Sequence, residues 1–79
     1  MIGYVWLLVP IDPGEIYEAR EAEAFMSKKK ALASGLNEIE ICGSSDEKTE
    51  EEIAEIKADF LRYDECEYCY LVCIPYYPD

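Results

Sequence analysis

The chain has 79 residues, with 18 acidic side chains, 7 basic ones, no histidine and a formal net charge of −11. This length predicts a single domain, residues 1–79, with a small core. The acidity argues against direct binding of nucleic acid or of an anionic membrane surface. The lack of histidine removes the commonest general base and metal ligand. Because 51% of the residues are hydrophobic, we still expect the chain to fold.

The apolar start of the chain, residues 2–11, is interrupted by Pro10. It is too short to cross a bilayer, which takes roughly 20 residues. It also lacks the basic region and cleavage site of a signal peptide. We therefore expect a cytoplasmic protein, without contact with a membrane. In that reducing compartment the cysteines should be thiols, namely Cys42, Cys66, Cys69 and Cys73.

The first half of the chain predicts a strand, a turn and a helix. Residues 4–9 are apolar at every position, which is typical of a central strand covered on both faces. The Asp-Pro-Gly sequence at 12–14 has two interpretations: a cap that begins a helix, or a hairpin turn into a second strand at 15–21. We favour the hairpin, followed by a helix over 21–34 that ends at Gly35 as its C-cap.

Helical phase supports the hairpin. Ile16 lies off the apolar arc of the helix over 21–34, so a helix that began at Asp12 would point it away from the core. The three lysines at 28–30 fall in the second half of the predicted helix, where cations suit the macrodipole. The apolar arc itself is formed by Ala22, Phe25, Met26, Leu32, Ala33 and Leu36.

The second half predicts a strand, a helix and a strand. Residues 36–42 alternate between apolar and acidic side chains, which predicts a strand with one solvated face. Thr49 and Glu52 form a capping box that begins a helix ending near Tyr63. The last strand is expected at 67–74, before two prolines. The apolar stripe of this second helix comprises Ile53, Ile56, Phe60 and Tyr63.

These elements predict an α+β, two-layer sandwich. One small sheet of three or four strands is covered on one face by two helices. The order is β-β-α-β-α-β with the hairpin at 12–14, or β-α-β-α-β with the helix cap.

The cysteines could form a metal or redox site, since Cys66 and Cys69 have Cys-x-x-Cys spacing. A zinc site usually needs two such pairs, and the chain has one. In a strand these two side chains would point to opposite faces. A thioredoxin-like motif would open a helix, whereas this one enters a strand. We therefore predict no metal and no cofactor, and interpret the cysteines as small buried residues, with zinc and redox chemistry as lesser alternatives.

Negative charge is concentrated between residues 44 and 67, which contain ten acids and three bases. These acids have two interpretations. They could be the solvated face of a helix, or carboxylates presented where a nucleic acid would present phosphates. The residues of this predicted acidic surface are Asp46, Glu47, Glu50, Glu51, Glu52, Glu55, Asp59, Asp64, Glu65 and Glu67.

Tyrosine is also unusually frequent, with seven residues. Tyrosines among acids suit an interface with a partner rich in arginine and lysine. The alternative is that the rings cover a small core. Tyr68 and Tyr70 should share a strand face, and the candidate binding residues are Tyr68, Tyr70, Tyr76 and Tyr77.

The size, the charge and the acidic run at 46–52 resemble the small acidic inhibitors made by bacteriophages, which include anti-CRISPR proteins and DNA mimics. This resemblance covers the profile of the whole chain rather than a motif. It implies a protein that blocks the basic surface of a nucleic-acid-handling partner, such as a CRISPR effector, in the host cytoplasm.

No catalytic motif is found, so we predict a protein that is not an enzyme. The leading hypothesis is the acidic inhibitor. The alternatives are an ordinary acidic interaction module or assembly subunit, and a cysteine-based zinc or redox module.

Overall fold

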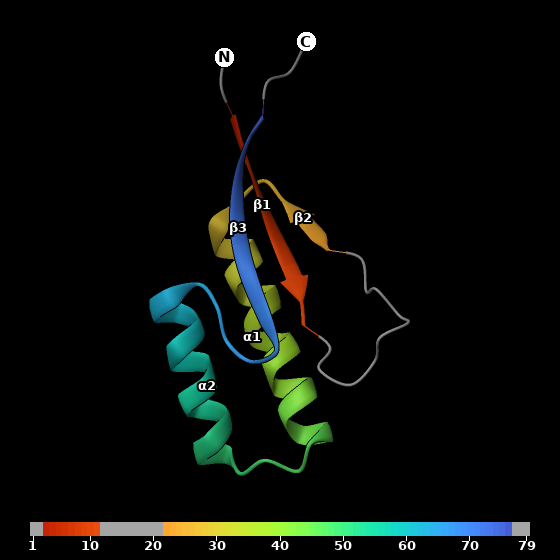
Figure 1. Ribbon diagram of the computed structural model, residues 1–79, viewed down its shortest axis with the longest axis vertical. Helices are drawn as coiled ribbons and strands as arrows, with labels where there is room; N and C mark the ends of the chain where they lie inside the picture. The colour runs from red at the N-terminus through yellow and green to blue at the C-terminus, as the bar shows by residue number, and fades with distance from the viewer. Residues whose placement is uncertain (1–2, 12–21, 77–79) are drawn as a thin grey trace.

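The computed structural model describes residues 3–11 and 22–76, where a three-stranded antiparallel sheet packs against two helices (Figure 1). In chain order the elements are β1 (Gly3–Pro10), β2 (Glu23–Phe25), α1 (Lys28–Ser45), α2 (Glu50–Tyr63) and β3 (Cys69–Tyr76). The predicted α+β class, with one small sheet and two helices, is confirmed. The order is β-β-α-α-β, which differs from both predicted orders. The predicted strand at 15–21 lies outside the described residues.

The central strand is β1, which pairs with β2 on one side and with β3 on the other. Its partnership with β3 runs in register from Gly3 opposite Tyr76 to Pro10 opposite Cys69. Residues that lie opposite each other in such a pair point to the same face. Leu8 and its partner Leu71 are both buried in the core, so this face of the sheet is the one that α1 covers.

The predicted helix over 21–34 is wrong at both ends. Residues 23–25 pair with β1 as β2, and the helix begins only after Ser27, whose hydroxyl accepts from the Lys30 N–H. The edge of β1 supplies hydrogen-bond partners that a helix at 23–25 would have to forgo. Met26, expected in the core, is 74% exposed.

The three lysines at 28–30 therefore occupy the first turn of α1 rather than its second half. Cations are disfavoured there by the helix macrodipole. For Lys28, two contacts offset this unfavourable interaction. Its Nζ lies 3.5 Å from an Asp64 carboxylate oxygen and 5.2 Å from the centroid of the Trp6 ring. This ion pair links the beginning of α1 to the end of α2.

The predicted strand at 36–42 is wrong, because these residues form the middle of α1. The alternation suggested that Ile39 and Ile41 share a face. In the helix Ile39 is fully buried, whereas Ile41 is 56% exposed. Gly35 lies inside α1 and is not its C-cap. The buried row of α1 has a period of four residues and consists of Ala31, Gly35, Ile39 and Gly43.

The two glycines of this row are where α2 approaches α1. A Cβ atom added to Gly35 would lie 2.4 Å from Cζ of Phe60, and one added to Gly43 would lie 2.7 Å from Cγ1 of Ile53. Both distances are far below van der Waals contact. Phe60 and Ile53 therefore fill notches on α1 that only glycine leaves open.

The predicted second helix is confirmed as α2, including its capping box. The Thr49 N–H donates to Glu52 Oε1 at 3.0 Å, and the Glu52 N–H donates back to the Thr49 hydroxyl at 3.1 Å. Ile53 and Phe60 are buried as expected, but Tyr63 is 62% exposed, so its place in the stripe was wrong. The final strand begins at Cys69, two residues later than predicted. Within the described residues, no helix is long and apolar enough to cross a membrane.

Candidate partner-binding surface

The outer face of α2 presents a row of three carboxylates, Glu51, Glu55 and Asp59. All three side chains are exposed, and no described residue forms an ion pair with them. Successive members are four residues apart, which places them about 6 Å apart along the helix axis. We call these three residues the acidic row. It is the part of the predicted acidic surface that the structure brings together on one line.

Several of the other predicted acids are engaged within the protein. Asp46 accepts a 2.6 Å hydrogen bond from the Tyr68 hydroxyl, and Glu67 lies 3.6 Å from the Lys48 ammonium. Asp64 pairs with Lys28, as described above. Glu52 caps α2, and the Thr49 backbone N–H, together with its hydroxyl, lowers the pKa of this carboxyl. These four acids therefore have structural partners, which the acidic row lacks within the part of the chain that the structure describes.

Three predicted acids are exposed but do not belong to the row. Glu47 lies in the turn before α2 with a φ of 59°, so it does not extend the row, although it is four residues before Glu51. Glu65 forms an isolated bridge with Tyr70 after α2. Glu50, in the first turn of α2, faces α1.

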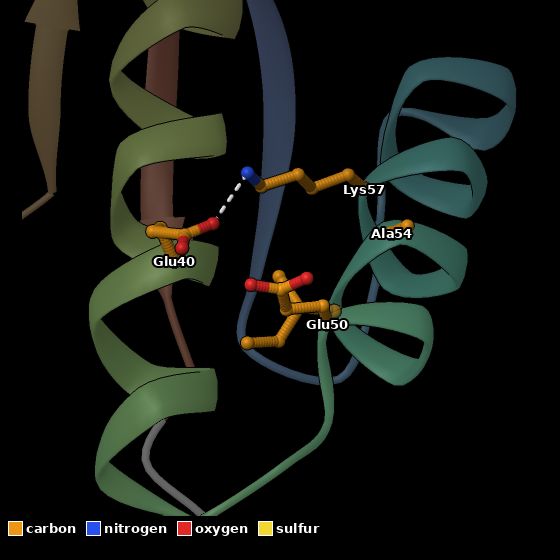
Figure 2. Close-up of a pocket in the computed structure, with 5 residues that line it drawn as sticks. Glu40, Glu50, Ala54 and Lys57 are labelled. Carbon is orange, nitrogen blue, oxygen red and sulfur yellow. Dashed lines mark hydrogen bonds and ion pairs between the residues drawn. The ribbon is translucent and has the colours of Figure 1, made fainter.

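A hollow of about 260 Å³ lies between the two helices (Figure 2). The Lys57 ammonium reaches across it to Glu40 on α1, 2.5 Å from its Oε2, and Glu50 lies at its lower end. Ile53 and Ala54 complete the lining. Lys57 is the one cation among the described residues that line this hollow, and it is already paired with Glu40, so the arrangement ties the two helices together.

The candidate tyrosines do not form one surface. Tyr68 lies before β3, is only 4% exposed and donates to Asp46, so it belongs to the core and does not share a face with Tyr70. Burial, followed by the hydrogen bond to Asp46, raises the pKa of the Tyr68 hydroxyl. Tyr70 and Tyr76 are exposed on β3. Tyr77 lies outside the described residues.

A second surface was not predicted from the sequence, namely the face of the sheet that points away from α1. The signal was available, because residues 70–76 are apolar at nearly every position and cannot all be buried by one layer of helices. No described element covers this face, on which Val72 is 36% exposed and Ile74 is 42% exposed. We call it the open sheet face; its side chains come from Val5, Leu7, Val9, Ala24, Tyr70, Val72, Ile74 and Tyr76.

Cys66 and Cys69 lie close together, contrary to the expectation that they point to opposite faces. Their Sγ atoms are 3.8 Å apart, because Cys66 precedes β3 and the chain reverses direction between them. The sulfur-to-sulfur hydrogen bond from Cys69, helped by backbone N–H groups of Tyr68 and Cys69, lowers the pKa of Cys66 to about 6. Cys69 is fully buried, and its pKa is raised.

Zinc should not copurify with the protein. A structural zinc ion needs four converging ligands, and the described residues contain no group of three or more His, Cys, Asp or Glu side chains placed to hold a metal ion. We expect elemental analysis to find far less than one zinc per chain, and chelator to leave the circular-dichroism spectrum unchanged. One zinc per chain, lost together with that spectrum on chelation, would contradict this.

Comparison of the chain with protein-family models, with curated proteins and with solved structures finds no match.

Proposed function

We propose that this protein is a non-enzymatic inhibitor that binds the basic, nucleic-acid-binding surface of a partner protein. The proposal rests on one observation: the acidic row is exposed and has no cation partner among the described residues. If these acids stabilised the fold, we would expect them to form ion pairs with cations of the same chain. A row of unpaired carboxylates instead supplies charges for an external partner.

The spacing of the row also suits a site built for phosphates. Its carboxylates follow one another every 6 Å or so along α2. Phosphates on one DNA strand advance about 3.4 Å per nucleotide along the duplex axis, so alternate phosphates are separated by about 7 Å along that axis. Lysine and arginine side chains arranged for alternate phosphates could therefore contact successive carboxylates. The host cytoplasm, where CRISPR effectors act, is the compartment in which we place this interaction.

Reversing Glu51 and Glu55 to lysine should abolish salt-sensitive binding and leave the fold intact. Both side chains are exposed, so the fold should tolerate the change. Glu55→Lys creates an i, i+4 attraction to Asp59, which offsets part of the cost of a cation in the first turn of α2. The wild-type protein, immobilised, should capture nucleic-acid-binding proteins from a bacterial lysate at low salt, and added DNA should release them. The double variant should bind a captured partner about tenfold more weakly or worse, and the difference should shrink at high salt.

A matched pair of single variants separates a local effect from one of net charge. Glu55→Lys lies in the acidic row, whereas Glu23→Lys changes the charge equally on β2. Only Glu55→Lys should weaken binding strongly. Equal losses from both variants, or simultaneous binding of DNA and this protein to the partner, would contradict nucleic-acid mimicry.

The open sheet face favours a second candidate function, that of an assembly subunit. Contiguous exposed apolar residues commonly mark protein interfaces. In that case the acids maintain solubility, and the apolar strand faces bind the partner. In the same experiment Ile74→Lys, on the open sheet face, would abolish capture, and the reversal of Glu51 and Glu55 would not.

A further inference from the structure

Cys66 and Cys69 differ sharply in their environment. Cys66 is half-buried in the turn between α2 and β3, whereas Cys69 is fully buried at the first position of β3. Their sulfur atoms are 3.8 Å apart. A disulfide requires sulfurs about 2 Å apart, so a rotation of the half-buried Cys66 side chain would bring the two sulfurs within bonding distance.

The turn that holds the two thiols is fixed from both ends. The Cys66 N–H donates to the Cys69 carbonyl at 2.9 Å. Next to this hydrogen bond, Glu65 and Tyr70 form an isolated antiparallel β-bridge. The Leu71 N–H donates to the Asp64 carbonyl at 2.7 Å. The turn is therefore held closed whether or not a covalent bond joins the sulfurs.

We infer that Cys66 and Cys69 form a redox-active dithiol that exchanges with low-molecular-weight disulfides of neutral or positive charge. Cys66 is the attacking group, since it is only half-buried, and the fully buried Cys69 is the resolving group. The charge preference follows from the surroundings. Glu65 and Glu67 flank Cys66 in a chain of net charge −11, which repels anionic disulfides.

The exchange proceeds in two displacements. The Cys66 thiolate attacks one sulfur of the small disulfide, whose S–S bond breaks, and the departing thiolate takes a proton from water. Cys69 then gives its proton to water and attacks Cys66 Sγ. The S–S bond of the mixed disulfide breaks, and the second small thiolate leaves and takes a proton from water. The protein is oxidised to the Cys66–Cys69 disulfide, and the small disulfide is reduced to two thiols.

The electrostatic environment supports these roles. The hydrogen bond from Cys69 holds the pKa of Cys66 low, and the Glu67 carboxylate opposes that effect. Cys69 faces Cys66, Glu38 and Cys42, all of which raise its pKa. The thiolate is the nucleophile in such exchange, so the negative charge resides on the accessible sulfur.

The test uses 2-hydroxyethyl disulfide, which is neutral, and mass spectrometry of the whole chain. The wild-type protein should lose two hydrogens, and so should Cys73→Ser, a control that removes the exposed thiol of β3. Cys66→Ser should not form this product. Cys69→Ser should stop at a mixed disulfide on residue 66 and identify the intermediate.

A second measurement needs no variant. Alkylation of Cys66 by neutral iodoacetamide, located by peptide mass spectrometry, should be half-maximal near pH 6, against about 8.5 for an ordinary thiol. A wild-type chain that only acquires mixed disulfides at Cys73, or a Cys66 that alkylates with a midpoint near 8.5, would overturn the proposal. Neither measurement depends on a partner protein. The dithiol proposal can therefore fail while the proposal for the acidic row stands.

Discussion

Replacing Phe60 with aspartate should unfold the protein at room temperature. The ring is fully buried, where it fills the notch at Gly35 near Leu8. Truncation of a buried phenylalanine costs about 3–5 kcal/mol, and an unpaired buried carboxylate adds to that loss. A domain has only about 5–15 kcal/mol of stability, and small domains tend toward the lower end. Urea unfolding followed by circular dichroism measures the effect.

The neighbouring residue provides the control. Leu61→Asp places the same charge on the same turn of α2, but Leu61 is 53% exposed. This variant should unfold within about 1 kcal/mol of the wild type, since surface substitutions are usually mild. A Phe60→Asp protein that unfolds cooperatively at nearly the wild-type urea concentration would show that α2 does not dock on α1 as described.

Gly35→Ala should destabilise the protein, although alanine is the better helix former. In an exposed helix this change would gain about 1 kcal/mol. Here the new methyl group would lie 2.4 Å from Cζ of Phe60 and 3.3 Å from Cδ1 of Leu8. Overpacking of this kind costs about 1–3 kcal/mol. We expect a net loss of stability in urea or thermal unfolding, because α2 must move away to relieve the contact.

Two further variants make this prediction specific. Asn37→Ala, exposed on the same helix, should gain a few tenths of a kcal/mol from propensity alone. Phe60→Leu combined with Gly35→Ala should be less destabilised than the two single changes predict together, since the smaller side chain leaves room for the methyl group. A Gly35→Ala variant that is more stable than the wild type would show that Phe60 does not pack against Gly35 as closely as described.

The glycines also explain why the sequence predicted α2 and failed on α1. The helix α2 is specified locally, by a capping box and by Ile53 and Phe60 seven residues apart. In α1, a glycine could mark either the end of an element or a close contact between two helices. Gly35 was interpreted as the end of a helix, and the strand predicted at 36–42 stopped just before Gly43, because glycine usually interrupts elements. Their role is contact with α2, which depends on residues far along the chain.

The candidate surfaces also differ in how far local sequence determines them. The acidic row follows from i, i+4 spacing on a helix that the sequence predicts well, so most of it could be anticipated. Tyr68 could not be placed, because its burial depends on a hydrogen bond to Asp46, 22 residues away. The proximity of Cys66 and Cys69 depends on a chain reversal just before β3, whereas strand geometry at 67–69 was assumed.

The position of β1 at the centre of the sheet has a consequence for synthesis of the protein. Gly3 pairs with Tyr76, so β1 is synthesised before the other described strands and its pairing is completed last. Until β3 emerges, β1 has, among the described residues, only the three of β2 beside it, and its other edge is unpaired. Pairing across so much of the chain is slow, because a large loop must close before any contact is gained. The nascent chain therefore displays an aggregation-prone strand from the emergence of β1 until that of β3, and its high negative charge keeps such chains apart during that interval.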